Sequence, residues 1–451
     1  MTTKVTTELE KLFDLSSQND DIFTVCLTVD TGLEWQAVDE CKLKICDNLR
    51  AFKDRGKIYF NVAFEDFPKI LKLRSIDNVH IVGDVRYLEF DPENAELNLQ
   101  RVIDSSHNYK QLKKCLNAWK SITKYPGKLY PTHQEYESAV SQYNVKKEEN
   151  KNLIVEEKRG SRKRGCDPSL AKEDSILSYR VTCERNGKHT FDSSKIATII
   201  GGELQDQYHW IVDLTSYQLE ILSRVNNSEM ILLLRVTNES LHRRNITYFG
   251  PTTLRATVAY NLISLAEPKP GEIIIDPMCG GGSIPIEAAI EFPECYILAG
   301  DNHDKAIERS RLNFDALNKS FKSNLIQWNV AYLPFKDSSI DVFVTDMPFG
   351  KRSGLKSDNR IFYKKYLIEL ARVVKLKHGR LVLLTYDRRS ITIALQATQD
   401  LFKQKKTLGV NMGGLPAACY VLKRTNLTFE QFQTTINNKT TKNKTNSSSG
   451  D

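Results

Sequence analysis

The sequence predicts an α/β protein whose C-terminal part is a mainly parallel, doubly wound sheet, preceded by smaller α+β units. From residue 273 onward, short runs of β-branched and apolar residues alternate with stretches of helical length, the order in which helices cover both faces of a parallel sheet. Two of these runs end at an aspartate followed by a turn, IIIDPMCGGGSIPIE and VFVTDMPFGKR. Because ligands bind beyond the carboxyl ends of parallel strands, we expect both turns to border one pocket.

The N-terminal part of the chain predicts two α+β units separated by a charged stretch. Residues 146–172 contain VKKEEN and EEKRGSRKRG and are too poor in apolar residues to form a core, so we expect a disordered insertion there. The asparagine-rich turn at 226–228 predicts a hairpin. Periodicity predicts strands at residues 22–29, 57–64, 78–85, 175–185, 217–225 and 230–237, and helices at residues 33–46, 67–73, 110–122, 193–201 and 252–265.

The C-terminal part predicts strands and helices that alternate at lengths typical of a mainly parallel, doubly wound sheet. Its last two strands are expected to form an antiparallel edge of the sheet. Beyond residue 425 the sequence turns to Asn, Thr, Lys and Ser without apolar periodicity, which predicts a disordered tail. The first expected strand begins at residue 273, and the others are at 296–300, 325–330, 340–345, 380–384, 407–411 and 417–423. The expected helices are at 285–291, 305–317, 360–374 and 390–402.

Composition limits the classes of function. The chain has 451 residues, enough for about two to four domains, and its net charge of +8 is compatible with a polyanionic partner. Nine cysteines without a C-x-x-C pair argue against a disulfide framework and against a structural zinc site, so no metal site is expected. The N-terminus lacks a secretion signal, and no apolar run approaches a membrane span. We therefore expect a soluble, cytoplasmic protein without a membrane partner.

The first aspartate-bearing turn predicts a nucleotide-like ligand. Glycines after a buried strand let the backbone approach a ligand without Cβ obstruction, and CGGGSIP has no G-K-[ST] and so is not a P-loop. Asp301, at the end of the next strand, can accept both hydroxyls of a ribose, and Asp276 can hold a positively charged amino group. Asn329 ends the third strand, where it can bond an adenine amino group. Each of these residues also has a structural interpretation as a turn or helix cap.

The second turn, Asp346-Met347-Pro348-Phe349, has the chemistry that an exocyclic base amine needs. The lone pair of such an amine is delocalised into the ring, which makes the amine a poor nucleophile. The carboxylate of Asp346 and the carbonyl of Met347 can accept its two N–H bonds and hold the nitrogen nearer tetrahedral. Pro348 stiffens the turn, and Phe349 offers a face for base stacking. The two turns together predict a methyl donor and a nucleobase acceptor.

The role of two groups of basic residues has two interpretations in each case. Lys351 and Arg352 follow the second turn and are either contacts to a substrate phosphate or part of a solvated loop. The run at 158–164 either contacts RNA or is a solvated linker, which is the commoner case for a basic run.

The paired motifs DPMCGGGSIPIEAA and VTDMPFGKR resemble motifs I and IV of the THUMP-containing tRNA guanine-N2-methyltransferases. SLHRRNITYFGPTTLRATVAYNL and VNMGGLPAACYVLKRT are also similar to that family, and the resemblance covers about residues 22–425. The family usually has Gly-Thr-Gly where this chain has three glycines, and aspartate where it has Asn329. The resemblance assigns the acceptor motif to the second turn. It assigns donor binding to Asp276, Cys279, Gly280, Gly282 and Asp301.

The resemblance implies an enzyme, a tRNA (guanine-N2)-methyltransferase that uses S-adenosylmethionine. The implied acceptor is the exocyclic N2 of guanine in the tRNA acceptor stem, at nucleotide 6, with nucleotide 7 as a second candidate. The implied partners are tRNA and a small zinc-binding activator subunit. The implied domains are ferredoxin-like at 1–104, THUMP RNA-binding at 105–240, and Rossmann-like methyltransferase at 241–425, followed by the tail at 426–451.

Three other functions stay open at this point. An RNA N6-adenine methyltransferase would use the same second turn, because that turn serves any exocyclic base amine. A non-catalytic RNA-binding protein with a decayed methyltransferase domain would keep the fold alone. A nicotinamide-dependent oxidoreductase shares the glycine turn and the ribose-binding acid but gives no role to DMPF.

Overall fold

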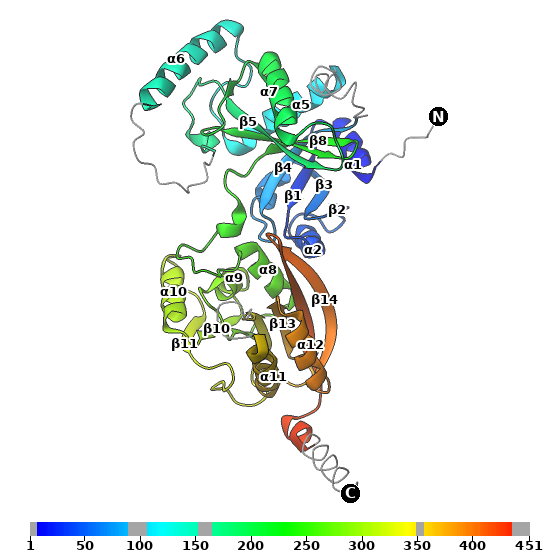
Figure 1. Cartoon of the computed structure of the whole chain (residues 1–451), viewed down its shortest axis with the longest axis vertical. Helices are drawn as coiled ribbons and strands as arrows, with labels where there is room; N and C mark the ends of the chain where they lie inside the picture. The colour runs from blue at the N-terminus through cyan, green and yellow to red at the C-terminus, as the bar shows by residue number, and fades with distance from the viewer. Residues whose placement is uncertain (1–6, 89–105, 152–164, 349–355, 435–451) are drawn as a thin grey trace, which may run out of the picture. The chain divides into compact units, whose positions relative to one another are not determined.

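The computed structural model describes residues 7–88, 106–151, 165–348 and 356–434 of the chain (Figure 1). The chain divides into two compact units, each built around a β-sheet. We call them the N-terminal unit, which holds the described parts of Met1–Thr28, Val38–Leu73 and Asp77–Ser240, and the C-terminal unit, which holds the described parts of Val29–Ala37, Arg74–Ile76 and Leu241–Asp451.

The N-terminal unit contains a mixed sheet. Its strands are β1 (Ile22–Thr28), β2 (Phe52–Asp54), β3 (Lys57–Ala63), β4 (Asn78–Tyr87), β5 (Ser178–Asn186), β6 (Ile211–Val212), β7 (Leu219–Asn226) and β8 (Glu229–Arg235). They lie in the order β2-β3-β1-β4-β8-β7-β5-β6. The antiparallel pairing of β4 with β8 joins the two predicted α+β units into one continuous sheet. The predicted hairpin is confirmed, since β7 pairs antiparallel with β8 up to Asn226 and Glu229.

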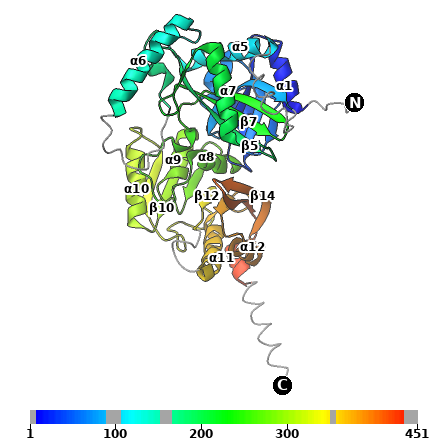
Figure 2. The same cartoon turned by 45° about the horizontal axis from the view of Figure 1, so that its top comes forward.

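Most helices of this unit are labelled in Figure 1, and several of them are labelled again in Figure 2. They are α1 (Glu8–Ser17), α2 (Glu34–Lys44, whose first four residues belong to the C-terminal unit), α3 (Phe67–Ile70), α5 (Ser106–Thr123), α6 (His133–Lys151) and α7 (Ser193–Tyr208). The predicted insertion at 146–172 is wrong at both ends, because α6 continues to Lys151 and a 3-10 turn forms at Pro168–Leu170. Residues 152–164, with the basic run, lie outside the described residues.

The C-terminal unit contains the predicted doubly wound sheet. Its strands are β9 (Ile273–Asp276), β10 (Tyr296–Asp301), β11 (Ser323–Gln327), β12 (Val342–Asp346), β13 (Arg380–Thr385), β14 (Phe402–Met412) and β15 (Leu415–Arg424). They lie in the order β11-β10-β9-β12-β13-β15-β14. The strands from β11 to β13 are parallel, and β15 and β14 are antiparallel, which confirms the antiparallel edge predicted from the sequence.

Helices cover both faces of this sheet, and the alternation of side chains along β12 shows how. Val342 and Val344 pack into one buried cluster with α8 and α9, whereas Phe343, between them, packs into another with α11 and α12. Successive residues of a strand point to opposite faces, so a run buried on both sides reads as continuously apolar. The helices are α8 (Ala256–Leu265), α9 (Ser283–Glu291), α10 (Asp304–Asp315), α11 (Lys356–Val373) and α12 (Arg388–Ala397).

Two short segments from the first hundred residues belong to the C-terminal unit. Thr31 accepts a hydrogen bond from the Asn411 N–H of β14 at 2.9 Å, and Leu33 is fully buried in the cluster that contains α8. Gly32 has a φ of +100° and lies so close to the Gly409 carbonyl that a Cβ would be 1.8 Å from its oxygen, so only glycine fits there. The predicted 1–104 domain is therefore not one contiguous block.

The tail also differs from its prediction. Phe432 is 3% exposed and packs into the cluster that contains α11 and α12, and Arg424 Nη2 donates to the Leu427 carbonyl at 2.7 Å. The prediction of disorder from residue 426 onward is thus wrong for residues 426–434. A single aromatic residue in a polar segment produces no apolar periodicity from which this order could be predicted. Residues 435–451 lie outside the described residues. Within the described ranges, none of the helices is both long enough and apolar enough to cross a bilayer.

Candidate active site

Three aspartates end three neighbouring strands of the C-terminal sheet. Asp276 is the last residue of β9, Asp301 of β10 and Asp346 of β12. In the parallel registers, Asp276 pairs with Ala299 of β10, and Ile275 pairs with Phe343 of β12. All three carboxylates therefore lie at the carboxyl edge of the sheet, where ligands of doubly wound proteins bind.

The glycine turn between β9 and α9 is shaped by two left-handed residues. Gly280 has a φ of +54° and Gly282 a φ of +87°, conformations that side-chain-bearing residues rarely adopt. A Cβ on Gly280 would meet no atom within 4 Å, whereas one on Gly282 would lie 2.6 Å from the Ser310 hydroxyl. The Gly282 N–H donates to the Cys279 carbonyl at 2.8 Å and closes the turn. Gly280 therefore faces open space, and Gly282 is packed against α10.

Asp301 organises the glycine turn. Its Oδ2 accepts the Gly280 N–H at 3.0 Å, and its Oδ1 accepts the His303 N–H at 3.0 Å. Asp301 is not the cap of the next helix, because His303 caps α10 through Nδ1, which accepts the Lys305 N–H at 3.2 Å. Each carboxylate oxygen has a second lone pair, so Asp301 can still accept two ribose hydroxyls.

Asp276 is almost completely buried, with 2% of its surface exposed. Burial, reinforced by the charge of Asp301, raises the pKa of Asp276 to about 7, although the Met278 N–H bond to Oδ1 (3.2 Å) opposes that shift. Cys279, beside it, is buried, and its thiol Sγ lies 4.0 Å from the Ser310 hydroxyl. Burial raises the pKa of Cys279 too, so the thiol stays neutral and acts as packing in the turn.

Asp346 is the carboxylate with the least support from the protein. Its Oδ1 is buried and has no hydrogen-bond partner in the described part of the chain. Burial, with the nearby charge of Asp276, raises the pKa of Asp346 well above its usual range. A buried acceptor without a donor is costly unless a ligand supplies one. The site therefore suits a ligand that brings cationic and N–H groups to this edge.

The acceptor turn after Asp346 is held on both sides. The Met347 N–H donates to the Leu384 carbonyl at 2.8 Å, and the Met347 side chain is fully buried in the core. The Tyr363 hydroxyl of α11 donates to the Pro348 carbonyl at 2.6 Å. The Met347 carbonyl accepts no hydrogen bond from any residue of the described ranges. Phe349, Lys351 and Arg352 lie outside those ranges.

Asn329 lies two residues beyond the end of β11 and is exposed. Its Oδ1 accepts the Ala331 N–H at 3.0 Å, and its carbonyl accepts the Tyr332 N–H at 2.9 Å. The turn-capping interpretation of this residue is thus correct. Its Nδ2 remains available as a donor, which suits a ring nitrogen of adenine better than an adenine amino group.

Asn313 was missed in the sequence although it braces the glycine turn. Its Oδ1 accepts the N–H groups of Thr247 and Tyr248 at 3.0 and 2.8 Å, and its Nδ2 donates to the Gly281 carbonyl at 2.8 Å. This buried amide ties the ITYFG segment to the glycine turn. A single asparagine in a polar helix such as α10 carries no pattern that distinguishes it.

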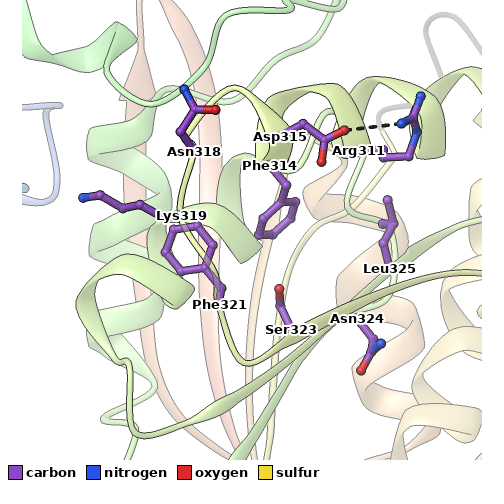
Figure 3. A pocket seen from close by; sticks show the side chains of 9 residues that line it. All are labelled: Arg311, Phe314, Asp315, Asn318, Lys319, Phe321, Ser323, Asn324 and Leu325. Atoms are coloured by element: carbon purple, nitrogen blue, oxygen red, sulfur yellow. Dashed lines mark hydrogen bonds and ion pairs between the residues drawn. The ribbon is translucent and has the colours of Figure 1, made fainter.

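A hollow of about 370 Å³ lies between the end of α10 and β11, and Figure 3 shows its lining. Phe314, Phe321 and Leu325 form its apolar part, and Arg311 pairs with Asp315 at 3.3 Å. None of the predicted site residues lines it. All nine cysteines have free thiols. In the described ranges, no group of three or more His, Cys, Asp or Glu side chains could hold a metal.

Comparison with known proteins gives two matching families. Residues 243–417 match the RMKL-like methyltransferase domain, and residues 166–235 match the THUMP domain. The human tRNA (guanine(6)-N(2))-methyltransferase THUMP3 is 36% identical over 91% of this chain and 90% of its own length.

Solved structures share the fold. TrmN from Thermus thermophilus superimposes with a TM-score of 0.64 and 21% identity over 89% of this chain and 99% of that chain. SMU.472, a putative methyltransferase complexed with SAH, superimposes with a TM-score of 0.59 and 14% identity over 89% of this chain and 98% of that chain. At these identities the likeness shows the fold alone.

Proposed function

The chain belongs to the THUMP-domain tRNA (guanine-N2)-methyltransferase family, and from that premise we propose that it methylates N2 of guanine at nucleotide 6 of the tRNA acceptor stem. The observation that carries this proposal is the set of three aspartates at one sheet edge, with Asp346 lacking a partner among the described residues. The methyl donor is S-adenosylmethionine, the cofactor of this family.

The donor side fits a cationic nucleoside. Bound there, S-adenosylmethionine supplies an electrophilic methyl group on a positively charged sulfur. Asp301 would accept the ribose hydroxyls, and Asp276 would hold the ammonium group, whose charge favours the ionised carboxylate. The open face of Gly280 gives the ligand access to the backbone. Cys279 and Gly282 shape that turn, and the Asn329 amide would bond the adenine ring.

The acceptor side fits an exocyclic amine with two N–H groups. Asp346 Oδ1 and the Met347 carbonyl, both without donors in the described chain, would accept those bonds and localise the nitrogen lone pair. Pro348 fixes the backbone of the turn, and Phe349 would stack on the base. The methylated nitrogen must then lose a proton. Asp346 can accept this proton at Oδ1, because burial raises the pKa of its carboxyl group.

The remaining assignments are part of the same proposal. The N-terminal unit would bind the tRNA through its THUMP domain at 105–240 and its ferredoxin-like domain at 1–104, while 241–425 carries the reaction. The THUMP match at 166–235 supports this division. We also propose a small zinc-binding activator subunit as partner, nucleotide 7 as a second acceptor, and a cytoplasmic location.

Mass analysis of nucleosides from treated tRNA tests the function. The full-length chain, S-adenosylmethionine and a tRNA transcript with guanine at nucleotide 6 should yield N2-methylguanosine, and a transcript with adenine there should yield no methylated base. Formation of N6-methyladenosine from the second transcript would establish the adenine alternative instead. An activator requirement would appear as turnover only after co-expression with that subunit.

Binding of labelled S-adenosylmethionine distinguishes the proposed enzyme from the non-catalytic alternative. A chain that binds tRNA but not the labelled donor, even with its activator, would be an RNA-binding protein with a decayed enzyme domain. The intact Asp276, Asp301 and Asp346 argue against that outcome.

A further inference from the structure

A buried tyrosine lies directly behind the acceptor turn. Tyr363 of α11 is fully buried, its hydroxyl donates to the Pro348 carbonyl at 2.6 Å, and it lies 2.8 Å from the Thr385 hydroxyl. Thr385 is the last residue of β13, which pairs in parallel with β12. The tyrosine therefore connects the ends of two neighbouring strands at the edge where the reaction is placed.

The direction of these bonds follows from their chemistry. A carbonyl only accepts, so the single tyrosine proton points to Pro348, and Thr385 must donate to Tyr363. Thr385 Oγ1 in turn accepts the Asp387 N–H at 3.1 Å. The result is a one-way chain of hydrogen bonds that ends at the acceptor turn, and in such a chain each bond polarises the next. Burial raises the pKa of Tyr363, so the phenol remains a donor.

We propose that Tyr363 is a positioning residue that aims the Met347 carbonyl at the substrate amine. This inference rests on the proposed function, because it concerns the same acceptor turn. The Met347 N–H is held by the Leu384 carbonyl at 2.8 Å, and the Pro348 carbonyl is held by Tyr363. The peptide that carries the Met347 carbonyl lies between these two fixed peptides. Since Pro348 has a fixed φ and no N–H, the flanking bonds set the direction of that carbonyl.

The bond also decides which carbonyl of the turn accepts the amine. With Tyr363 donating to Pro348, the Met347 carbonyl is the one without a donor in the described residues. Loss of the tyrosine hydroxyl would leave both carbonyls competing for the same N–H. The amine would then sample two positions, of which one is out of line with the methyl group.

The other end of the chain is anchored to two helices. The Asp387 carboxylate accepts the Ser390 N–H at 3.0 Å and the Asn359 Nδ2 at 3.1 Å. Asn359 and Tyr363 are four residues apart on α11 and so share one face of the helix. The position of Tyr363 is thus fixed by β13, α11 and the start of α12.

The chain offers a matched control for the loss of a buried tyrosine hydroxyl. Tyr125 in the N-terminal unit is 2% exposed, and its hydroxyl donates to the Ser175 carbonyl at 2.9 Å. Tyr125→Phe removes the same kind of bond without touching the acceptor turn. Any loss of stability common to both variants can therefore be separated from an effect on the reaction.

The test compares Tyr363→Phe with Tyr125→Phe in the full-length chain expressed with its activator. Single-turnover and steady-state methylation of tRNA give kcat and KM, and calorimetry gives the Kd of S-adenosylmethionine. We expect kcat of Tyr363→Phe to fall about 10- to 100-fold, with KM and Kd within about twofold of the wild type. Thr385→Val should lower kcat about threefold by removing the donor to Tyr363, and Thr385→Ser should restore it.

Equal kcat values for Tyr363→Phe and Tyr125→Phe would overturn the proposal, as would a loss confined to KM or to the Kd of the donor. A wild-type chain that makes no N2-methylguanosine in the same assay marks failure of the proposed function, whereas a fully active Tyr363→Phe marks failure of the positioning role alone.

Discussion

The end of β10, where we propose that the donor binds, and the end of β12, where we propose that the acceptor binds, are built in opposite ways. At the donor end, both oxygens of Asp301 already accept backbone N–H groups, from Gly280 and His303. At the acceptor end, Asp346 Oδ1 is buried without a partner among the described residues. In the proposed arrangement, the protein thus supplies its own hydrogen bonds at the cofactor side and leaves those at the base side to the substrate. Changes at the two ends should affect different constants.

Asp346→Ala should have the largest effect. We expect kcat to fall at least about a thousandfold, because the amine loses its charged acceptor in a buried site. The Kd values of S-adenosylmethionine and of tRNA should change less than about threefold. Rapid-quench methylation assays and filter binding measure these constants.

Asp337→Ala is the matched control for that variant. Asp337 is an exposed carboxylate of the same unit that pairs with Arg372 at 2.6 Å, and its loss should leave kcat within about twofold. Normal turnover by Asp346→Ala would refute the acceptor role, and with it the contrast between the two ends.

Asp301→Ala should act on the donor instead. It removes the ribose acceptors and the anchor of the Gly280 N–H, so the Kd of S-adenosylmethionine should rise about 100-fold. At saturating donor, kcat should fall less than about threefold. Calorimetry at several donor concentrations separates the two effects. A large loss of kcat with unchanged Kd would show that the two ends are not functionally distinct.

The raised pKa of Asp276 predicts a pH dependence of donor binding. In the free protein this pKa is about 7, and a cationic donor prefers the carboxylate, so affinity should be complete above pH 7 and weaken below it. Between pH 7.5 and pH 6 the Kd should rise about eightfold. Calorimetry across this range measures it.

Asp276→Asn provides the control for that profile, since its Kd should not change with pH. Folding raises the pKa of Asp276 from 3.8 to about 7, so the carboxylate destabilises the free protein progressively from about pH 4 to pH 7 and fully above it. Thermal melts of Asp276→Asn should accordingly show a gain in Tm at pH 8 that shrinks at pH 5. A gain that grew toward low pH would contradict the assignment.

Asn329→Asp should have the smallest effect. The carboxylate can keep the bond from the Ala331 N–H and also accept from the adenine amino group, so the Kd of S-adenosylmethionine should fall about two- to threefold. Weaker donor binding in this variant would show that the Asn329 Nδ2 group, as a donor, is the better partner of the adenine ring.

The C-terminal sheet could be predicted because its signals are local. Each buried strand is a short apolar run, and β9 and β12 end at residues with turn chemistry, so Asp276 and Asp346 were found without any knowledge of the fold. The parallel order then brought them to one edge. The specific ligand came from the resemblance to a family, since the glycine turn alone fits several cofactors.

The features that could not be predicted depend on contacts between residues far apart in the chain. The pairing of β4 with β8 merges two predicted units, yet an edge strand looks the same in sequence whether or not another strand covers it. Phe432 and Asn313 are single residues in polar surroundings, and their burial follows from what they meet. Tyr363 is likewise one aromatic residue among several in α11, and nothing in its spacing reveals its bond to Pro348.

The packing of residues 29–37 on β14 has a consequence for biosynthesis. Asn411 is synthesised 380 positions after Thr31, its partner, which takes a ribosome about 20 to 80 s at usual speeds. Leu33, fully buried in the finished protein, packs in a cluster whose other buried members lie between Val258 and Cys419. This core can therefore be completed only late in synthesis, when β14 has emerged. We expect the segment at 29–37 to lack its full packing on the nascent chain until then.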